Sequence, residues 1–181
     1  KREELPDLKP DFIYISHTHA DHFDPDTLCV FDKEIPILVS WYKHNFTERA
    51  VKSVGFKDVR VSDPNKPLNL NGKDTCWIEP SAKYSAVDSI GVFSIDGFNV
   101  LNANDCGFNY DQCKSLKERF KVIDAACIPS GMQGPYPAFY DNLTLKEKKL
   151  ESEKKKNNNF MTIIEYLKVL KPKYLFALTG G

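Results

Sequence analysis

The chain has 181 residues, with 25 Lys plus Arg and 25 Asp plus Glu, so its formal net charge is zero. This balance excludes a polycation adapted to nucleic acid or to an anionic membrane surface. Hydrophobic residues make up 41% and charged residues 28%, as in a globular protein rather than a disordered or membrane-embedded one. The chain has 4 histidines, and all but one of them lie close together near its start.

The sequence lacks several signals that would place the protein in a particular compartment. No apolar run approaches the roughly 18–20 residues of a transmembrane helix, and no apolar stretch of a signal peptide follows the first residues. We therefore expect no membrane span and a cytoplasmic location. The 5 cysteines include no CxxC pair, which predicts reduced thiols rather than a disulfide framework or a zinc finger.

The first part of the chain predicts strands that alternate with helices. An apolar run at 12–15 predicts a buried strand, and Asp24-Pro25 supplies an N-cap and a first-turn proline for a short helix. Further strands are predicted at 35–39 and 59–61. A helix at 43–54 lies between them and ends at Gly55.

The remainder of the chain changes its pattern twice. Residues 67–103 predict antiparallel strands, because Asn71-Gly72 and Asp96-Gly97 are turn pairs between apolar runs. Alternation then returns. The elements are a helix at 110–120, a strand at 122–128, a long lysine-rich helix and a strand at 173–178. We interpret the lysine runs as a solvated helical face, with a basic docking surface as the minor alternative. The order of elements predicts an α/β protein, taken as a single domain over residues 1–181.

A histidine motif follows the first predicted strand directly and reads His17-Thr18-His19-Ala20-Asp21-His22. Imidazole and carboxylate groups suit zinc, iron or manganese. In an irregular loop, His17 and His19 can face one way while Asp21 and His22 turn to an adjacent point, so one loop can serve two metals. The sequence therefore predicts a metal site at the carboxyl end of this strand, where α/β proteins place their sites. His44 stands apart from the motif and is interpreted as an exposed or capping histidine.

The strand at 12–16 and the motif after it resemble the HxHxDH signature of the metallo-β-lactamase superfamily. The chain is most similar to the branch of CMP-N-acetylneuraminate hydroxylase, ascorbate-phosphate lactonase and N-acyl-phosphatidylethanolamine phospholipase D. Three later segments are also similar to that branch: a strand ending in Asp105-Cys106, a Gly/Pro/aromatic loop at 131–140 and the segment 172–178. The resemblance implies an αββα sandwich.

The resemblance also implies a set of metal ligands. His17 and His19 would bind a first metal, and Asp21 and His22 a second. Asp105 would be the bridging or second-site carboxylate; the alternative for Asp105 is a turn-capping aspartate. The cofactor expected is zinc, as one or two ions, with iron or manganese as alternatives.

Two ligands of the family have no counterpart here. The family supplies a histidine before the hairpin that leads to Asp105, but the matching stretch 81–88 has none. Tyr84 lies nearest to that place. Its alternative roles are a phenolate ligand, a donor of a hydrogen bond to one of the metal ligands, and a packed aromatic side chain. The family's last histidine would follow the final strand, where the chain stops. Because several strands also normally precede the motif, we expect the chain to be a truncated part of a longer protein.

Three functions are compatible with this sequence. The favoured one is a hydrolase in which a metal-activated water, oriented by Asp21, attacks an ester, lactone, amide or phosphodiester. Tyr84, Tyr136 and Tyr140 would contact a small anionic substrate such as a sugar phosphate, nucleotide sugar or phospholipid, although packing explains such aromatics equally well. The second is a di-iron or Rieske-coupled oxygenase fragment, although the chain shows no Rieske-type Cys/His pairs. The third is a non-catalytic relative that binds a metal or ligand.

Overall fold

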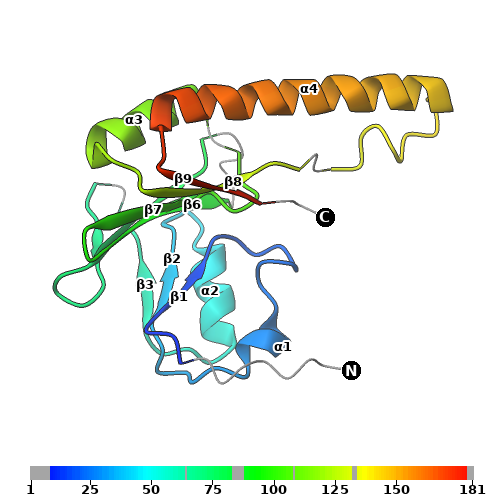
Figure 1. Ribbon diagram of the computed structural model, residues 1–181. Helices are drawn as coiled ribbons and strands as arrows, with labels where there is room; N and C mark the ends of the chain where they lie inside the picture. Colours follow the sequence, from blue (N-terminus) through cyan, green and yellow to red (C-terminus); the bar gives the residue numbers. More distant parts are fainter. Residues whose placement is uncertain (1–8, 64, 83–87, 108, 132–133, 179–181) are drawn as a thin grey trace. The chain divides into compact units, whose positions relative to one another are not determined.

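The computed structural model describes residues 9–63, 65–82, 88–107, 109–131 and 134–178. The chain divides into two compact units, Lys1–Gly91 and Val92–Gly181. Figure 1 labels most of the helices and strands of both units.

The first unit begins with strands that alternate with helices, as the sequence predicts. The elements in order are β1 (Ile13–Ile15), α1 (Pro25–Leu28), β2 (Ile37–Val39), α2 (Phe46–Ser53) and β3 (Val59–Val61). The strands form a parallel sheet in the order β1-β2-β3. Parallel neighbours need long crossover connections, which the segments containing α1 and α2 provide. The carboxyl ends of all three strands therefore meet at one edge of the sheet.

Local signals in the sequence set the ends of these helices. The carboxylate of Asp24 accepts hydrogen bonds from the backbone N–H groups of Asp26 and Thr27, so it caps α1 as predicted. Helix α2 is followed by Gly55, whose φ of +102° lies in the region that favours glycine. Strand β2 begins at Ile37 rather than at the predicted residue 35, because Pro36 has no N–H to donate to a neighbouring strand.

One apolar core holds the helices of the first unit against the parallel sheet. It includes side chains from all three strands, from both helices and from the connections between them. The fully or nearly buried members are Ile15, Leu28, Ile37, Val39, Val51 and Phe56. Because β2 is the middle strand, Ile37 and Val39 are completely buried. This core fixes the strand from which the histidine motif emerges.

Antiparallel strands complete the first unit. Strand β4 (Leu68–Asn69) pairs with β5 (Thr75–Pro80) around the predicted Asn71-Gly72 turn. The side-chain oxygen of Asn71 accepts hydrogen bonds from the N–H groups of Lys73 and Asp74, which closes the turn. Strand β6 (Ser89–Ile95) follows β5 in the sheet order and runs across the boundary between the units.

The second unit continues from β6 through a hairpin into parallel strands. Asp96 and Gly97 both have positive φ, 49° and 79°, as a two-residue type I′ turn requires, so the hairpin predicted there is confirmed. The sheet order is β6-β7-β8-β9, and β7, β8 and β9 are parallel to one another. The strands and helices after the hairpin are β7 (Phe98–Asn102), α3 (Tyr110–Phe120), β8 (Ala125–Pro129), α4 (Leu145–Leu170) and β9 (Tyr174–Leu178).

The long helix α4 has a solvated first half. Thr144 and Glu147 form a capping box at its start, and the ammonium group of Lys117 in α3 donates to the carbonyl of Leu170 at its end. Most lysines of the predicted charge runs are exposed, which both a solvated face and a basic docking surface require. Within the described residues, no helix combines the length and the apolar character needed to cross a membrane.

The start of β8 differs from the prediction by three residues. The backbone N–H of Asp124 donates to the carbonyl of Asn99, and the carboxylate of Asp124 accepts from the N–H of Asn99 and from the ammonium of Lys173. These bonds tie the residue before the strand to both neighbouring segments. Val122, predicted to lie within the strand, is 44% exposed and precedes it.

The carboxyl group of Asp124 is expected to stabilise the protein less as the pH becomes acid. The N–H of Asn99, followed by the ammonium of Lys173, lowers the pKa of the Asp124 carboxyl below its ordinary value. A lowered native pKa contributes stability above the unfolded-state value of about 3.9, and this contribution is lost as pH falls through the native value. We expect the stability advantage of the wild type over Asp124→Asn, measured by urea unfolding, to shrink between pH 6 and about pH 3. The exposed Asp141→Asn is the control; an advantage that does not change with pH would contradict this assignment.

Candidate metal centre

The histidine motif lies on the loop that leaves the carboxyl end of β1. Within this loop the carbonyl of His19 accepts hydrogen bonds from the backbone N–H groups of both His22 and Phe23. The resulting turn reverses the chain, so that His22 returns toward His17. Phe23 then packs against the apolar core of the unit, which anchors the far end of the turn.

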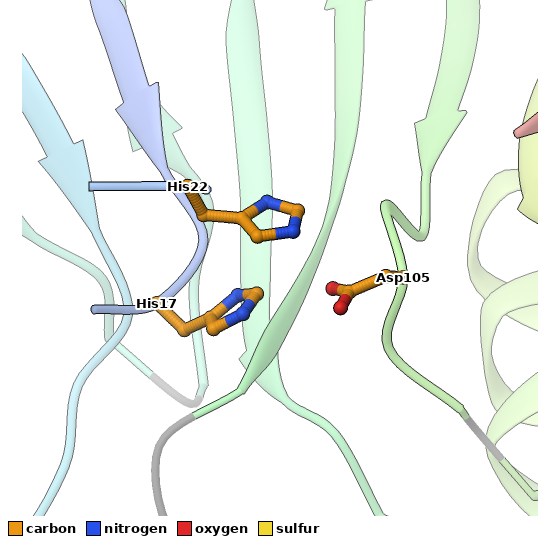
Figure 2. A group of neighbouring side chains, drawn as sticks. All are labelled: His17, His22 and Asp105. Atoms are coloured by element: carbon orange, nitrogen blue, oxygen red, sulfur yellow. The ribbon is translucent and has the colours of Figure 1, made fainter. Parts of the chain in front are cut away.

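The turn gathers the imidazoles of the motif. The ring centroids of His17 and His19 are 4.5 Å apart, and those of His17 and His22 are 4.2 Å apart. His17 is fully buried, His22 is partly buried and His19 is exposed, so the group extends from the core to the surface. Figure 2 shows the rings of His17 and His22 beside each other on this loop.

A hydrogen bond orients the buried imidazole. The hydroxyl of Ser16 lies 3.0 Å from Nδ1 of His17. A histidine that uses Nδ1 in this way keeps Nε2 for a metal, and such a contact fixes the orientation of the ring. Ser16 is itself held by the hydroxyl of Ser89, which donates to its carbonyl at 2.7 Å.

Asp88 is a candidate ligand that the sequence pattern did not predict. The structure places a carboxylate oxygen of Asp88 and ring nitrogens of His17 and His19 within 4.8 Å of one another, all in the first unit. The sequence held one signal for it, because Asp88 ends the stretch 81–88 in which the family's histidine is lacking. An aspartate before a strand is common, so that signal alone does not identify a ligand.

The other predicted ligands have different positions. The carboxylate of Asp21 is largely exposed and lies 3.5 Å from Nε2 of His22. Asp105 belongs to the second unit, where it follows β7, and its backbone N–H donates to the side-chain oxygen of Asn104. Their roles as ligands stay predictions. Tyr84 lies outside the described residues.

The predicted aromatic residues Tyr136 and Tyr140 lie together in the second unit. Their rings meet edge to face with centroids 5.0 Å apart. The hydroxyl of Tyr136 donates to Glu151 of α4, which raises the pKa of Tyr136. Lys155 of α4 also donates to the carbonyl of Tyr136. The loop is therefore held against α4, with both rings partly accessible to solvent.

Other potential ligands do not join the histidines. His44 is exposed and belongs to none of the ligand groups found among the described residues, as its isolated position suggests. The cysteines form no disulfide in the described chain. Burial raises the pKa of the Cys76 and Cys113 thiols to about 12, so neither is a thiolate at neutral pH.

The donor set fits a transition metal. It combines imidazole nitrogens with a carboxylate, the ligand types that zinc, iron and manganese accept. The three atoms of His17, His19 and Asp88 are close enough to reach one ion after small side-chain rotations, because each metal–ligand bond is about 2.0–2.2 Å long. The contact with Ser16 orients the ring of His17 before any ion binds.

Comparison with solved structures identifies the fold. A variant of the CmlA β-hydroxylase matches with a TM-score of 0.66 and 16% identity, over 94% of this chain and 37% of that chain. An isothiocyanate hydrolase from Delia radicum gut bacteria matches with a TM-score of 0.62 and 18% identity, over 94% of this chain and 62% of that one. The metallo-β-lactamase fold protein YhfI from Bacillus subtilis matches with a TM-score of 0.55 and 14% identity, over 94% of this chain and 76% of that one.

The chain therefore has the metallo-β-lactamase fold, which confirms the α/β class and, at the level of the fold, the superfamily resemblance. No protein-family model matches the sequence, and no curated protein matches it. The chain spans between about a third and two thirds of the length of the first three structures that it matches.

Proposed function

We propose that this chain carries the metal site of a hydrolase that acts on an ester, lactone, amide or phosphodiester. The observation that carries the proposal is that the rings of His19 and His22 both lie beside that of His17, and that a carboxylate oxygen of Asp88 lies within 4.8 Å of nitrogens of His17 and His19. A bound metal would polarise the scissile group and lower the pKa of water toward neutrality. The solved hydrolases of this fold, such as the isothiocyanate hydrolase, support the same class of chemistry.

The chain's own residues have distinct parts in this proposal. His17 and His19 hold one ion, and Asp21 and His22 hold the second. Asp21 also orients the attacking water. Asp105 completes the second set, as the resemblance implies. Because the carboxylate of Asp21 is exposed and adjacent to His22, it is available to accept a proton from water.

The proposed substrate is small and anionic, of the sugar phosphate, nucleotide sugar or phospholipid class. Tyr136 and Tyr140 offer a pair of partly accessible rings that α4 keeps in place, which suits stacking on a sugar or base. The proposed cofactor is zinc, with iron or manganese as alternatives, and the proposed location is the cytoplasm.

Metal removal tests the hydrolase. Protein purified without chelators is expected to contain zinc, iron or manganese by elemental analysis. The metal-loaded protein should hydrolyse at least one of four chromogenic probes: a nitrophenyl ester, a lactone, an anilide and bis(nitrophenyl) phosphate. Dialysis against chelator should abolish this activity, and readdition of metal should restore it. Protein that retains no metal and cannot be loaded would exclude the proposal.

An oxygenase is the second candidate, because imidazoles with a carboxylate also suit iron and because CmlA, which shares the fold, is a β-hydroxylase. A visible absorption band in the iron-loaded protein, with no hydrolysis of the probes, would favour it. A colourless zinc protein that hydrolyses a probe favours the hydrolase.

A further inference from the structure

Asp88 occupies the part of the chain in which the expected histidine is absent. Resting on the metal site of the proposed function, we propose that Asp88 is the third protein ligand of the ion held by His17 and His19. The site is then a set of two histidines and one carboxylate. Compared with three histidines, this ligand set raises the affinity for manganese or iron relative to that for zinc.

The first support is the distance between the ligand atoms. An oxygen of Asp88 and nitrogens of His17 and His19 lie within 4.8 Å of one another, and all three residues belong to the same compact unit. Asp88 is partly buried, so its carboxylate is incompletely solvated before a metal arrives. A cation at this point would offset the cost of removing that charge from water.

The second support is that the backbone around Asp88 is tied on both sides. The carbonyl of Asp88 accepts a hydrogen bond of 2.8 Å from the N–H of Ser81. The next residue, Ser89, is buried, and its hydroxyl contacts both the carbonyl of Ser16 and the hydroxyl of Tyr14. Ser16 immediately precedes His17 and bonds to its ring. One chain of hydrogen bonds therefore sets the position of Asp88 relative to His17.

The third support is the charge of the ligand set. Three neutral imidazoles would leave a divalent ion with its full charge, whereas one carboxylate reduces the net charge of the centre by one. Carboxylate oxygen is the harder ligand and suits manganese, and two histidines with one carboxylate occur in non-haem iron(II) sites as well as in catalytic zinc sites. Restoring a histidine at residue 88 should reverse this preference.

Titration of the metal-free full chain with Mn²⁺ and with Zn²⁺ tests the proposal. Mn²⁺ binding is measured by loss of the free-ion electron paramagnetic resonance signal, and Zn²⁺ binding by calorimetry. Asp88→Asn should weaken Mn²⁺ binding by about 100-fold or more, since even groups behind the ligands contribute 10–100-fold. Asp88→His should keep Zn²⁺ binding while losing Mn²⁺ binding. Asp96→Asn, in the hairpin turn that follows β6, is the control and should change neither the Mn²⁺ nor the Zn²⁺ affinity.

The outcomes separate the two proposals. Wild-type protein that binds neither ion overturns both the hydrolase and the role of Asp88. If the wild type and Asp88→Asn bind Mn²⁺ equally tightly, only the role of Asp88 is overturned. Circular dichroism and thermal unfolding of each metal-free variant show whether it is folded. If Asp88→Asn fails to fold, Asp88→His decides, because an unchanged ratio of Mn²⁺ to Zn²⁺ affinity would contradict the proposal.

Discussion

Replacing His19 with alanine is expected to remove metal binding and, with it, hydrolysis. His19 is exposed, so its loss leaves the core unchanged while it deletes one imidazole from the group. We expect metal affinity to fall by about 100-fold or more, beyond the 10–100-fold contributed by groups that only support ligands. Elemental analysis and calorimetry measure this directly, without knowledge of the natural substrate.

His44→Ala is the matched control for that experiment. It removes the same side chain from another exposed position, where the ring contacts Phe46 and joins no ligand group among the described residues. Its metal content and probe hydrolysis should equal those of the wild type. Equal metal binding by His19→Ala and by the wild type would refute the assignment of His19 as a ligand.

The second large effect concerns the core beneath the site. Ile37 lies on the middle strand of the parallel sheet, is completely buried and belongs to the core that also contains Ile15 and Val51. Ile37→Ala removes apolar contacts and leaves a cavity, which is expected to lower the free energy of unfolding by about 2–5 kcal/mol. The measurement is the midpoint of urea unfolding at an unchanged slope.

Val30→Ala provides the comparison for the core substitution. Val30 is 59% exposed, so the same kind of truncation should change stability by less than about 0.5 kcal/mol. Similar midpoints for the two variants would show that Ile37 is not part of a packed core. Because β1 and its histidine loop rest on this core, Ile37→Ala is also expected to weaken metal binding.

Contiguous signals allowed much of the fold to be predicted. The cap at Asp24, the Asp96-Gly97 turn and the strand at 59–61 all appear where the sequence indicates them. Each depends on neighbouring residues, whose backbone preferences act locally. The start of β8 was misplaced, because Asp124 is positioned by partners from β7 and from the residue before β9, which lie far along the chain.

The same division holds at the candidate site. The sequence by itself determined that His17, His19 and His22 meet on one loop, because six consecutive residues after a strand cannot lie far apart. Only the tertiary structure brought Asp88 to His17 and His19, since its position depends on the hydrogen bonds of Ser89 to Ser16 and Tyr14 across the fold. Such contacts join residues that are far apart in the chain, so no local periodicity of the sequence indicates them. The structure thus placed a carboxylate where the sequence showed only a missing histidine.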